Sequence, residues 1–137
     1  MRRRGLLSLG VALLGLGGCS RPYPSTPGAV VMAALAAANQ RNFEEAKRYL
    51  ESQGSIMFGK KLPSASVELT PERWKTFTQD GRIRRLAVSF EQIKGDVAVV
   101  WADLSYDDNR AARIECILLR EPVGWMMMTP SMTKKGW

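Results

Sequence analysis

Two cysteines and the absence of histidine limit the chemistry that this sequence can support. Cys19 follows an apolar stretch and a run of small residues, whereas Cys116 lies between apolar residues in the second half of the chain. Without histidine a His-based catalytic triad is excluded, and a zinc site would have to use carboxylates and one thiol. The sequence also lacks a glycine-rich phosphate loop and a dinucleotide-binding fingerprint. We therefore expect no cofactor and no metal.

Cys19 has the clearest chemical role. Arg2-Arg3-Arg4 precedes an apolar stretch from Gly5 to Leu16, and this is the arrangement of an export signal. The residues Leu16-Gly17-Gly18-Cys19 resemble the bacterial lipobox, in which small residues separate a leucine from the modified cysteine. The resemblance implies that residues 1–18 are removed as a lipoprotein signal peptide and that the Cys19 thiol carries diacylglycerol.

An uncleaved membrane helix is the alternative for this leader. A membrane span needs about 20 apolar residues, and the polar sequence Ser20-Arg21-Pro22 follows the apolar stretch too soon. We therefore expect a protein of the cell envelope, anchored to a membrane by lipid at Cys19. In bacteria with two membranes, Ser20 in place of aspartate favours the outer membrane, with the domain facing the periplasm.

Composition and charge are those of one small globular domain. The chain has 137 residues and a formal charge of +7, and the leader contributes three arginines, so the mature part carries 17 basic and 13 acidic residues, or +4. Such a mild surplus lacks the dense basic stripe of a nucleic-acid-binding protein. We expect a lipidated, proline-rich tether at 19–27, a domain at 28–130 and a basic C-terminal tail at 131–137.

Three helix starts can be recognised in the part of the chain that precedes Arg82. Thr26-Pro27 combines a hydroxyl cap with proline at the first helical position, which predicts a helix to about Asn39. Asn42 and Glu45 have the spacing of a capping box and predict a second helix that ends at Gln53-Gly54. Thr70-Pro71 repeats the first pattern and predicts a short helix over 71–79, whereas residues 55–69 show no regular period.

From Arg82 onward the apolar period changes from helical to two, which predicts strands. Leu86, Val88 and Phe90 alternate, but Ile83 is out of phase with them, so we expect a β-bulge near Arg84-Arg85. Helices followed by an antiparallel meander indicate an α+β fold with a sheet of about four strands. The strands are expected from Arg82 to the turn at Lys94-Gly95-Asp96, then over 97–106, 112–120 and 125–128.

The order of several short segments is similar to small bacterial lipoproteins of the cystatin-like, nuclear-transport-factor-two-like superfamily, many of them domains of unknown function. These segments are Ala33 to Ala38, Asn42 to Ala46, Gly95 to Val100 and Gly124-Trp125. The resemblance implies N-terminal helices packed on a strongly curved antiparallel sheet, which forms a cone that can hold a pocket. The expected bulge suits that curvature.

Asp103 is the candidate catalytic residue. It shares a strand face with Val97, Val99 and Trp101, and apolar neighbours could raise the pKa of its carboxyl and make it a general base. Ketosteroid isomerase, in the superfamily that the chain resembles, uses an acid in such a cone. The alternative is that Asp103, near the end of its strand, is solvated or paired with an arginine.

The favoured function is therefore non-enzymatic. We expect a lipid-anchored module that binds a small apolar ligand or an envelope protein partner, with Trp101, Asp103, Trp125 and Met127 as candidate ligand-binding residues. The alternative is a pocket enzyme of the ketosteroid-isomerase type with Asp103 as general base. Cys116, between apolar neighbours, is expected to be a core thiol.

Overall fold

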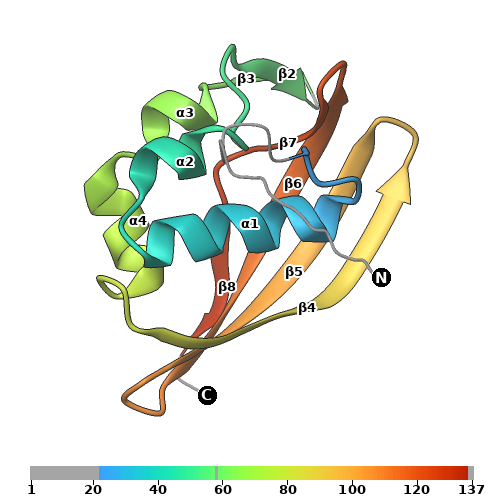
Figure 1. Cartoon of the computed structure of the whole chain (residues 1–137). Helices are drawn as coiled ribbons and strands as arrows, with labels where there is room; N and C mark the ends of the chain where they lie inside the picture. Colours follow the sequence, from blue (N-terminus) through green and yellow to red (C-terminus); the bar gives the residue numbers. More distant parts are fainter. Residues whose placement is uncertain (1–21, 58, 136–137) are drawn as a thin grey trace, which may run out of the picture.

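The computed structural model of the chain describes residues 22–57 and 59–135. Helices occupy the first half of the domain and a curved antiparallel sheet the second half, which confirms the predicted α+β class (Figure 1). In chain order the elements are α1 (Pro27–Asn39), α2 (Phe43–Lys47), β2 (Ser55–Met57), β3 (Lys60–Leu62), α3 (Ala65–Glu68), α4 (Pro71–Thr78), β4 (Ile83–Lys94), β5 (Val97–Tyr106), β6 (Ala111–Glu121), β7 (Gly124–Met127) and β8 (Ser131–Lys135).

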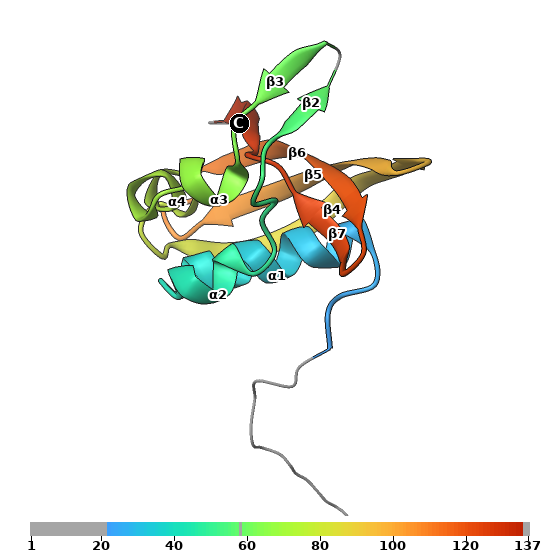
Figure 2. The same ribbon diagram turned by 90° about the horizontal axis from the view of Figure 1, so that it is seen from above.

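The main sheet has the order β4-β5-β6-β7, and β8 also pairs with β6. The long strand β6 pairs with β7 through its C-terminal part and with β8 through its N-terminal part. The sheet thus has five strands and not about four, because β8 lies in the segment that we interpreted as a C-terminal tail. Strands β2 and β3 form a separate hairpin that projects beyond the sheet (Figure 2).

Two irregularities bend the edge strand β4. The register shifts between Ile83 and Arg85, at the place where the sequence predicted a bulge. A second shift lies between Val88 and Phe90, and it was not predicted. Because of this second shift Phe90 pairs with Trp101 and is 39% exposed, whereas Val88 packs against the core. The prediction that Phe90 shares a face with Val88 is therefore wrong.

The helix starts agree with their predicted caps. Thr26 Oγ1 accepts a hydrogen bond from the Ala29 amide at 3.2 Å, and Asn42 Oδ1 accepts one from the Glu45 amide at 3.2 Å. Thr70 caps α4 in the same way, and α4 covers nearly the whole predicted range. Each of these caps satisfies an amide that the helix itself cannot pair.

Helix α2 is shorter than predicted, because it ends at Lys47 and not at Gln53-Gly54. The chain leaves the helix to pair with β7: the Glu51 amide donates to the Met127 carbonyl at 2.9 Å, and the Met127 amide donates to the Tyr49 carbonyl at 2.8 Å. These bonds to a distant strand replace the bonds that a longer helix would form.

The core lies between α1 and the concave face of the sheet (Figure 1). Trp74, Tyr49 and Tyr106 are the largest of the fully buried side chains in this core, and each is at most 2% exposed. The space between α1 and the sheet is therefore filled by the chain's own side chains. No helix within the described ranges is long and apolar enough to span a membrane.

Candidate functional site

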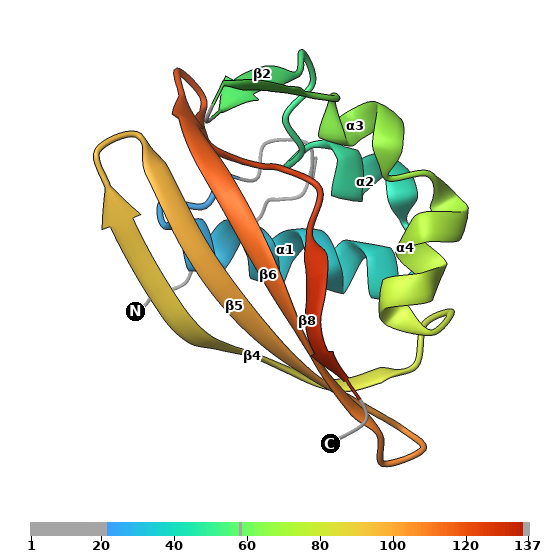
Figure 3. The ribbon, with the colours of Figure 1, turned by 180° about the vertical axis from the view of Figure 1, so that it is seen from behind.

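One end of the sheet face that points away from the helices is also apolar. Val97 pairs with Leu119 and Val99 with Ile117 across β5 and β6, and all four side chains are partly exposed. Seen from behind, β4, β5 and β6 have no helix of the described chain in front of them (Figure 3). We call these four side chains the outer apolar surface. A contiguous apolar patch on an uncovered sheet face is typical of a surface that binds a protein, a membrane or a ligand.

Trp101 extends this surface toward the charged part of the sheet. Its ring centroid lies 4.8 Å from that of Phe90, and its Nε1 donates to Glu115 Oε2 at 3.0 Å. The Arg113 guanidinium carbon lies 5.1 Å from the ring centroid. Trp101, which we proposed as a ligand-binding residue, therefore lies on the outside of the sheet with its polar edge already hydrogen-bonded.

Asp103 lies on the same outer face, beside Arg113. Arg113 Nε donates to Asp103 Oδ1 at 2.7 Å and Arg113 Nη2 donates to Oδ2 at 3.2 Å, so the contact is bidentate. The hydrogen bond from Arg113 lowers the pKa of the Asp103 carboxyl, and partial burial opposes this only in part. A general base in an apolar pocket needs the opposite shift. The arrangement is the ion pair that formed the alternative to the catalytic hypothesis.

Trp125 and Met127 lie on the inner side, in β7. Both are buried, with Met127 completely inaccessible, and Met127 pairs with Leu118 of β6. The Arg120 guanidinium carbon lies 4.5 Å from the Trp125 ring centroid. The structure thus divides the four candidate ligand-binding residues, since Trp101 and Asp103 are on the outer face and Trp125 and Met127 are in the core.

Of the two cysteines, only Cys116 lies among the residues that the structure describes. Cys116 is completely buried, and burial raises the pKa of its thiol. A thiol that stays protonated inside a core is a poor nucleophile. Cys19 lies outside the described residues. Within the described part of the chain no three carboxylate or thiol groups are placed to share a metal ion.

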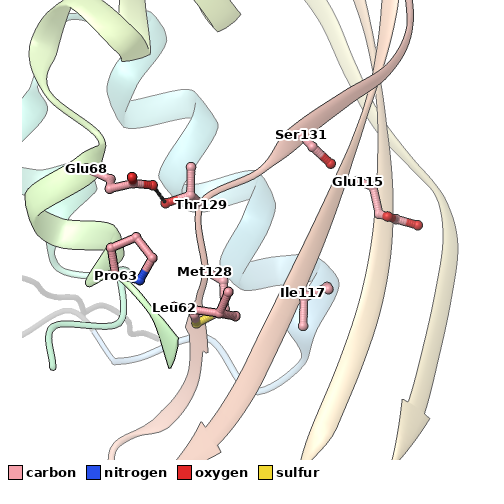
Figure 4. Close-up of a pocket in the computed structure, with 8 residues that line it drawn as sticks. All are labelled: Leu62, Pro63, Glu68, Glu115, Ile117, Met128, Thr129 and Ser131. Atoms are coloured by element: carbon pink, nitrogen blue, oxygen red, sulfur yellow. Dashed lines mark hydrogen bonds between the residues drawn. The ribbon is translucent and has the colours of Figure 1, made fainter. Parts of the chain in front are cut away.

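A pocket of about 140 Å³ opens beside the outer apolar surface (Figure 4). It lies between the β3–α3 segment and the edge of the sheet where the chain passes from β7 to β8. Leu62, Ile117 and Met128 supply apolar walls, and Thr129 Oγ1 donates to Glu68 Oε1 at 3.2 Å at one side. The residues that line the pocket are Leu62, Pro63, Glu68, Glu115, Ile117, Met128, Thr129 and Ser131.

The pocket was not predicted from the sequence. Its walls come from three separate stretches, around Leu62, around Ile117 and around Thr129, and none of them carries a local motif. Pockets that enclose a drug-sized molecule measure about 300–1,000 Å³, whereas a cavity of about 150 Å³ holds a group the size of benzene. The pocket therefore fits one apolar side chain better than a complete small-molecule ligand.

A second, wider depression of about 430 Å³ lies at the end of the cone near α4. Polar groups in its lining already form hydrogen bonds within the protein. Arg110 Nη2 donates to Gln79 Oε1 at 2.9 Å, and the Tyr106 hydroxyl donates to the Phe77 carbonyl at 2.7 Å. Polar groups make up about as much of its lining as apolar groups, whereas apolar groups predominate in the smaller pocket. We therefore place the candidate site at the smaller pocket.

Glu51 is a buried charged residue that sequence analysis did not single out. It is 1% exposed, and its carboxylate accepts from the Gln53 amide at 2.8 Å and from the Gly54 amide at 2.9 Å. These bonds hold the loop that leads from α2 to the β2–β3 hairpin. Glu51 is thus a structural residue that supports one side of the candidate site.

Comparisons with known proteins identify the fold. No protein-family model and no curated protein matches the chain. Among solved structures, a candidate ketosteroid isomerase from Shewanella frigidimarina is 16% identical and has a TM-score of 0.55, with 77% of this chain and 93% of that chain covered. An NTF2-like protein of unknown function from Shewanella baltica is 11% identical with a TM-score of 0.53, covering 77% and 90%.

A DUF4783 family protein from Bacteroides fragilis is 19% identical with a TM-score of 0.52, covering 77% of this chain and 94% of that chain. At these identities the similarity concerns the arrangement of helices and strands and carries no activity with it. The TM-scores with all three structures lie above 0.5 over about three quarters of this chain, which contains both the helices and the bent five-stranded sheet. The chain therefore has the NTF2-like α+β cone fold.

Proposed function

We propose that the chain is a non-enzymatic binding module of the bacterial cell envelope, anchored by lipid at Cys19. It recognises a protein partner through the outer apolar surface and the pocket beside it. The observation that carries this proposal is that Ile117 belongs to both, so the pocket opens from an apolar face that no described helix covers.

The size of the pocket favours a protein over a free small molecule as the partner. A volume of about 140 Å³ accepts one leucine-sized or phenylalanine-sized side chain. Protein interfaces are commonly organised in this way, with a buried apolar anchor in a pocket and flatter apolar contacts around it. Glu68 and Glu115 at the pocket, with Arg113 nearby, supply the polar surroundings of such an anchor.

The pocket-enzyme alternative gains no support from the position of Asp103. Its carboxylate is held by Arg113, and it lies on the outer face and not in the cone. The inner side offers Cys116, Trp125 and Met127, all of them buried. For these reasons the binding module is the function that we propose.

The lipid anchor can be tested directly. Radiolabelled palmitate is expected to enter the wild-type protein and the Cys116→Ala variant, and to be absent from Cys19→Ala. Fractionation is expected to place the labelled protein with membranes, in the outer membrane of a bacterium that has two. Equal labelling of wild type and Cys19→Ala would refute the anchor.

The binding surface can be tested with a photoreactive amino acid in the living envelope. Benzoyl-phenylalanine at Leu119 is expected to give a defined cross-linked product, and the same probe at Ala36, on the exposed side of α1, is expected to give none. Ile117→Trp fills the pocket and should remove at least about nine-tenths of the Leu119 product, which corresponds to about 1.4 kcal/mol of binding.

The circular dichroism spectrum of Ile117→Trp serves as the folding control. Cross-linking to a product of twice the chain mass would identify the partner as a second copy. Equal cross-linking from Leu119 and Ala36, or no effect of Ile117→Trp in a folded protein, would contradict the proposal.

A further inference from the structure

The segment before α1 packs against the domain through Tyr23. Its hydroxyl donates to the Trp125 carbonyl at 2.6 Å, and its ring centroid lies 5.6 Å from that of Tyr49. The Arg48 guanidinium carbon lies 5.9 Å from the Tyr23 ring centroid. Burial raises the pKa of the Tyr23 hydroxyl to about 12. The segment before α1 is thus fixed beside β7 (Figures 1 and 2).

Gly124 makes room for this docked ring. A Cβ atom added at Gly124 would lie 2.8 Å from Tyr23 Cδ2, which is closer than carbon atoms approach. Gly124 also has φ +140, a conformation that side chains with a Cβ rarely adopt. The absence of a side chain at 124 and the ring of Tyr23 therefore fit one another at the start of β7.

The docked Tyr23 sets a short limit on the distance from the domain to residue 19. Four Cα–Cα steps separate Tyr23 from Cys19, and a fully extended chain spans at most about 14 Å over that length. If Tyr23 were not docked, the first fixed residue would be Pro27, and the limit would rise to about 28 Å. The contact with Trp125 thus halves the reach of the tether.

The surface next to Tyr23 is formed by the turn between β6 and β7. Val123 in this turn is 58% exposed, and Pro122 beside it is also exposed. The charges around this end are mixed. Arg48 contacts Glu45 at 3.3 Å, Arg120 lies 3.6 Å from Asp96, and Glu121 acts on Tyr23 electrostatically.

We infer that the β6–β7 turn, with Val123 at its tip, rests against the bilayer that holds the lipid of Cys19. This inference rests on the proposed lipid anchor. The occupant is a lipid surface because the short tether leaves no room for a folded protein domain between that turn and the bilayer. With positive and negative groups nearly balanced around the turn, the contact takes zwitterionic as well as anionic headgroups. At about 3.3 Å per residue, β5 places the far turn at Asp107–Arg110 roughly 30 Å away.

The test uses acylated protein in vesicles of phosphatidylethanolamine and phosphatidylglycerol. An environment-sensitive fluorophore is attached in turn to Val123→Cys and Asp108→Cys, since Cys19 is blocked by lipid and Cys116 is buried. A lipid that carries a quencher in its headgroup region is expected to quench the Val123 probe at least about fivefold more strongly than the Asp108 probe. Equal quenching at the two positions would overturn the inference.

Variants of Tyr23 separate the docked tether from simple lipid anchoring. Tyr23→Ala is expected to bring the quenching at Val123 down toward that at Asp108, whereas Tyr23→Phe retains the ring and most of the effect. Unchanged quenching in a folded Tyr23→Ala protein would also overturn the inference. Mass spectrometry of each preparation reports the acyl group, and an unmodified Cys19 would refute the lipid anchor and the bilayer contact together.

Discussion

The two faces of the β5–β6 ladder are built from similar residues but have different surroundings. On the inner face Val100, Leu104, Ile114 and Leu118 are completely buried against the helices. On the opposite face, the four side chains of the outer apolar surface are of comparable size but remain partly exposed. A one-sided antiparallel sheet ordinarily carries polar residues on its uncovered face. The difference shows that the inner face contributes to the core, and it is the reason why we propose the outer face as the binding surface.

The largest expected difference between the two faces is the loss of stability when each of two isoleucines in β6 is replaced by alanine. Ile114 faces the core and Ile117 faces outward, so Ile114→Ala leaves a cavity and is expected to cost about 3 kcal/mol. Ile117→Ala is expected to cost about 1 kcal/mol or less and to weaken partner binding instead. Urea unfolding with equal m-values measures both. Equal losses of stability would contradict the assignment of faces.

Thiol reactivity distinguishes the same two faces by a smaller effect. In protein that lacks Cys19, the buried Cys116 thiol, with its raised pKa, is expected to react with iodoacetamide at least about 100-fold more slowly than a thiol introduced by Ile117→Cys. Labelling is followed by mass spectrometry at about pH 8, where an ordinary thiol is partly ionised. Similar rates in the folded state would mean that the core opens readily on the inner side.

The smallest expected effect concerns the polar part of the outer face. The pKa of Asp103 is lowered below its ordinary value of 3.8 in the folded protein, so its contribution to stability is present above that pH and is lost as the pH falls further. Asp103→Asn is expected to cost under about 1 kcal/mol at neutral pH, since both partners are partly exposed. The difference from wild type should shrink at about pH 2.5 in urea unfolding. A constant or growing difference would show that Arg113 does not act through charge.

Local sequence patterns were sufficient where the deciding atoms lie within one turn of chain. Thr26, Asn42 and Thr70 each cap a helix through an amide three residues on, and all three helix starts were predicted. The end of α2 was missed because it depends on the hydrogen bonds that the Tyr49 carbonyl accepts from, and the Glu51 amide donates to, the distant Met127. Such partners become known only when the sheet is assembled.

The candidate site, like the end of α2, depends on contacts between distant segments that local sequence patterns do not predict. The alternation in β5 was recognised, but both of its faces are apolar, and the sequence does not tell which one the helices cover. The pairing of Asp103 with an arginine was open as an alternative, but the identity of Arg113 as the partner depends on the register of β5 against β6. The pocket needs Leu62, Ile117 and Thr129 to meet, which only the tertiary structure provides.

The two register shifts in β4 have a consequence for chains that are crowded together. Among the described strands β4 pairs with β5 alone, so beyond Ile83, whose amide and carbonyl are bonded to the Asn39 side chain, one edge of β4 faces no other strand. Irregular backbone and exposed charges such as Arg84, Glu91 and Lys94 make this row a poor template for fibril growth. A dense layer of these molecules would therefore resist polymerising edge to edge, even though each one displays bare hydrophobic side chains.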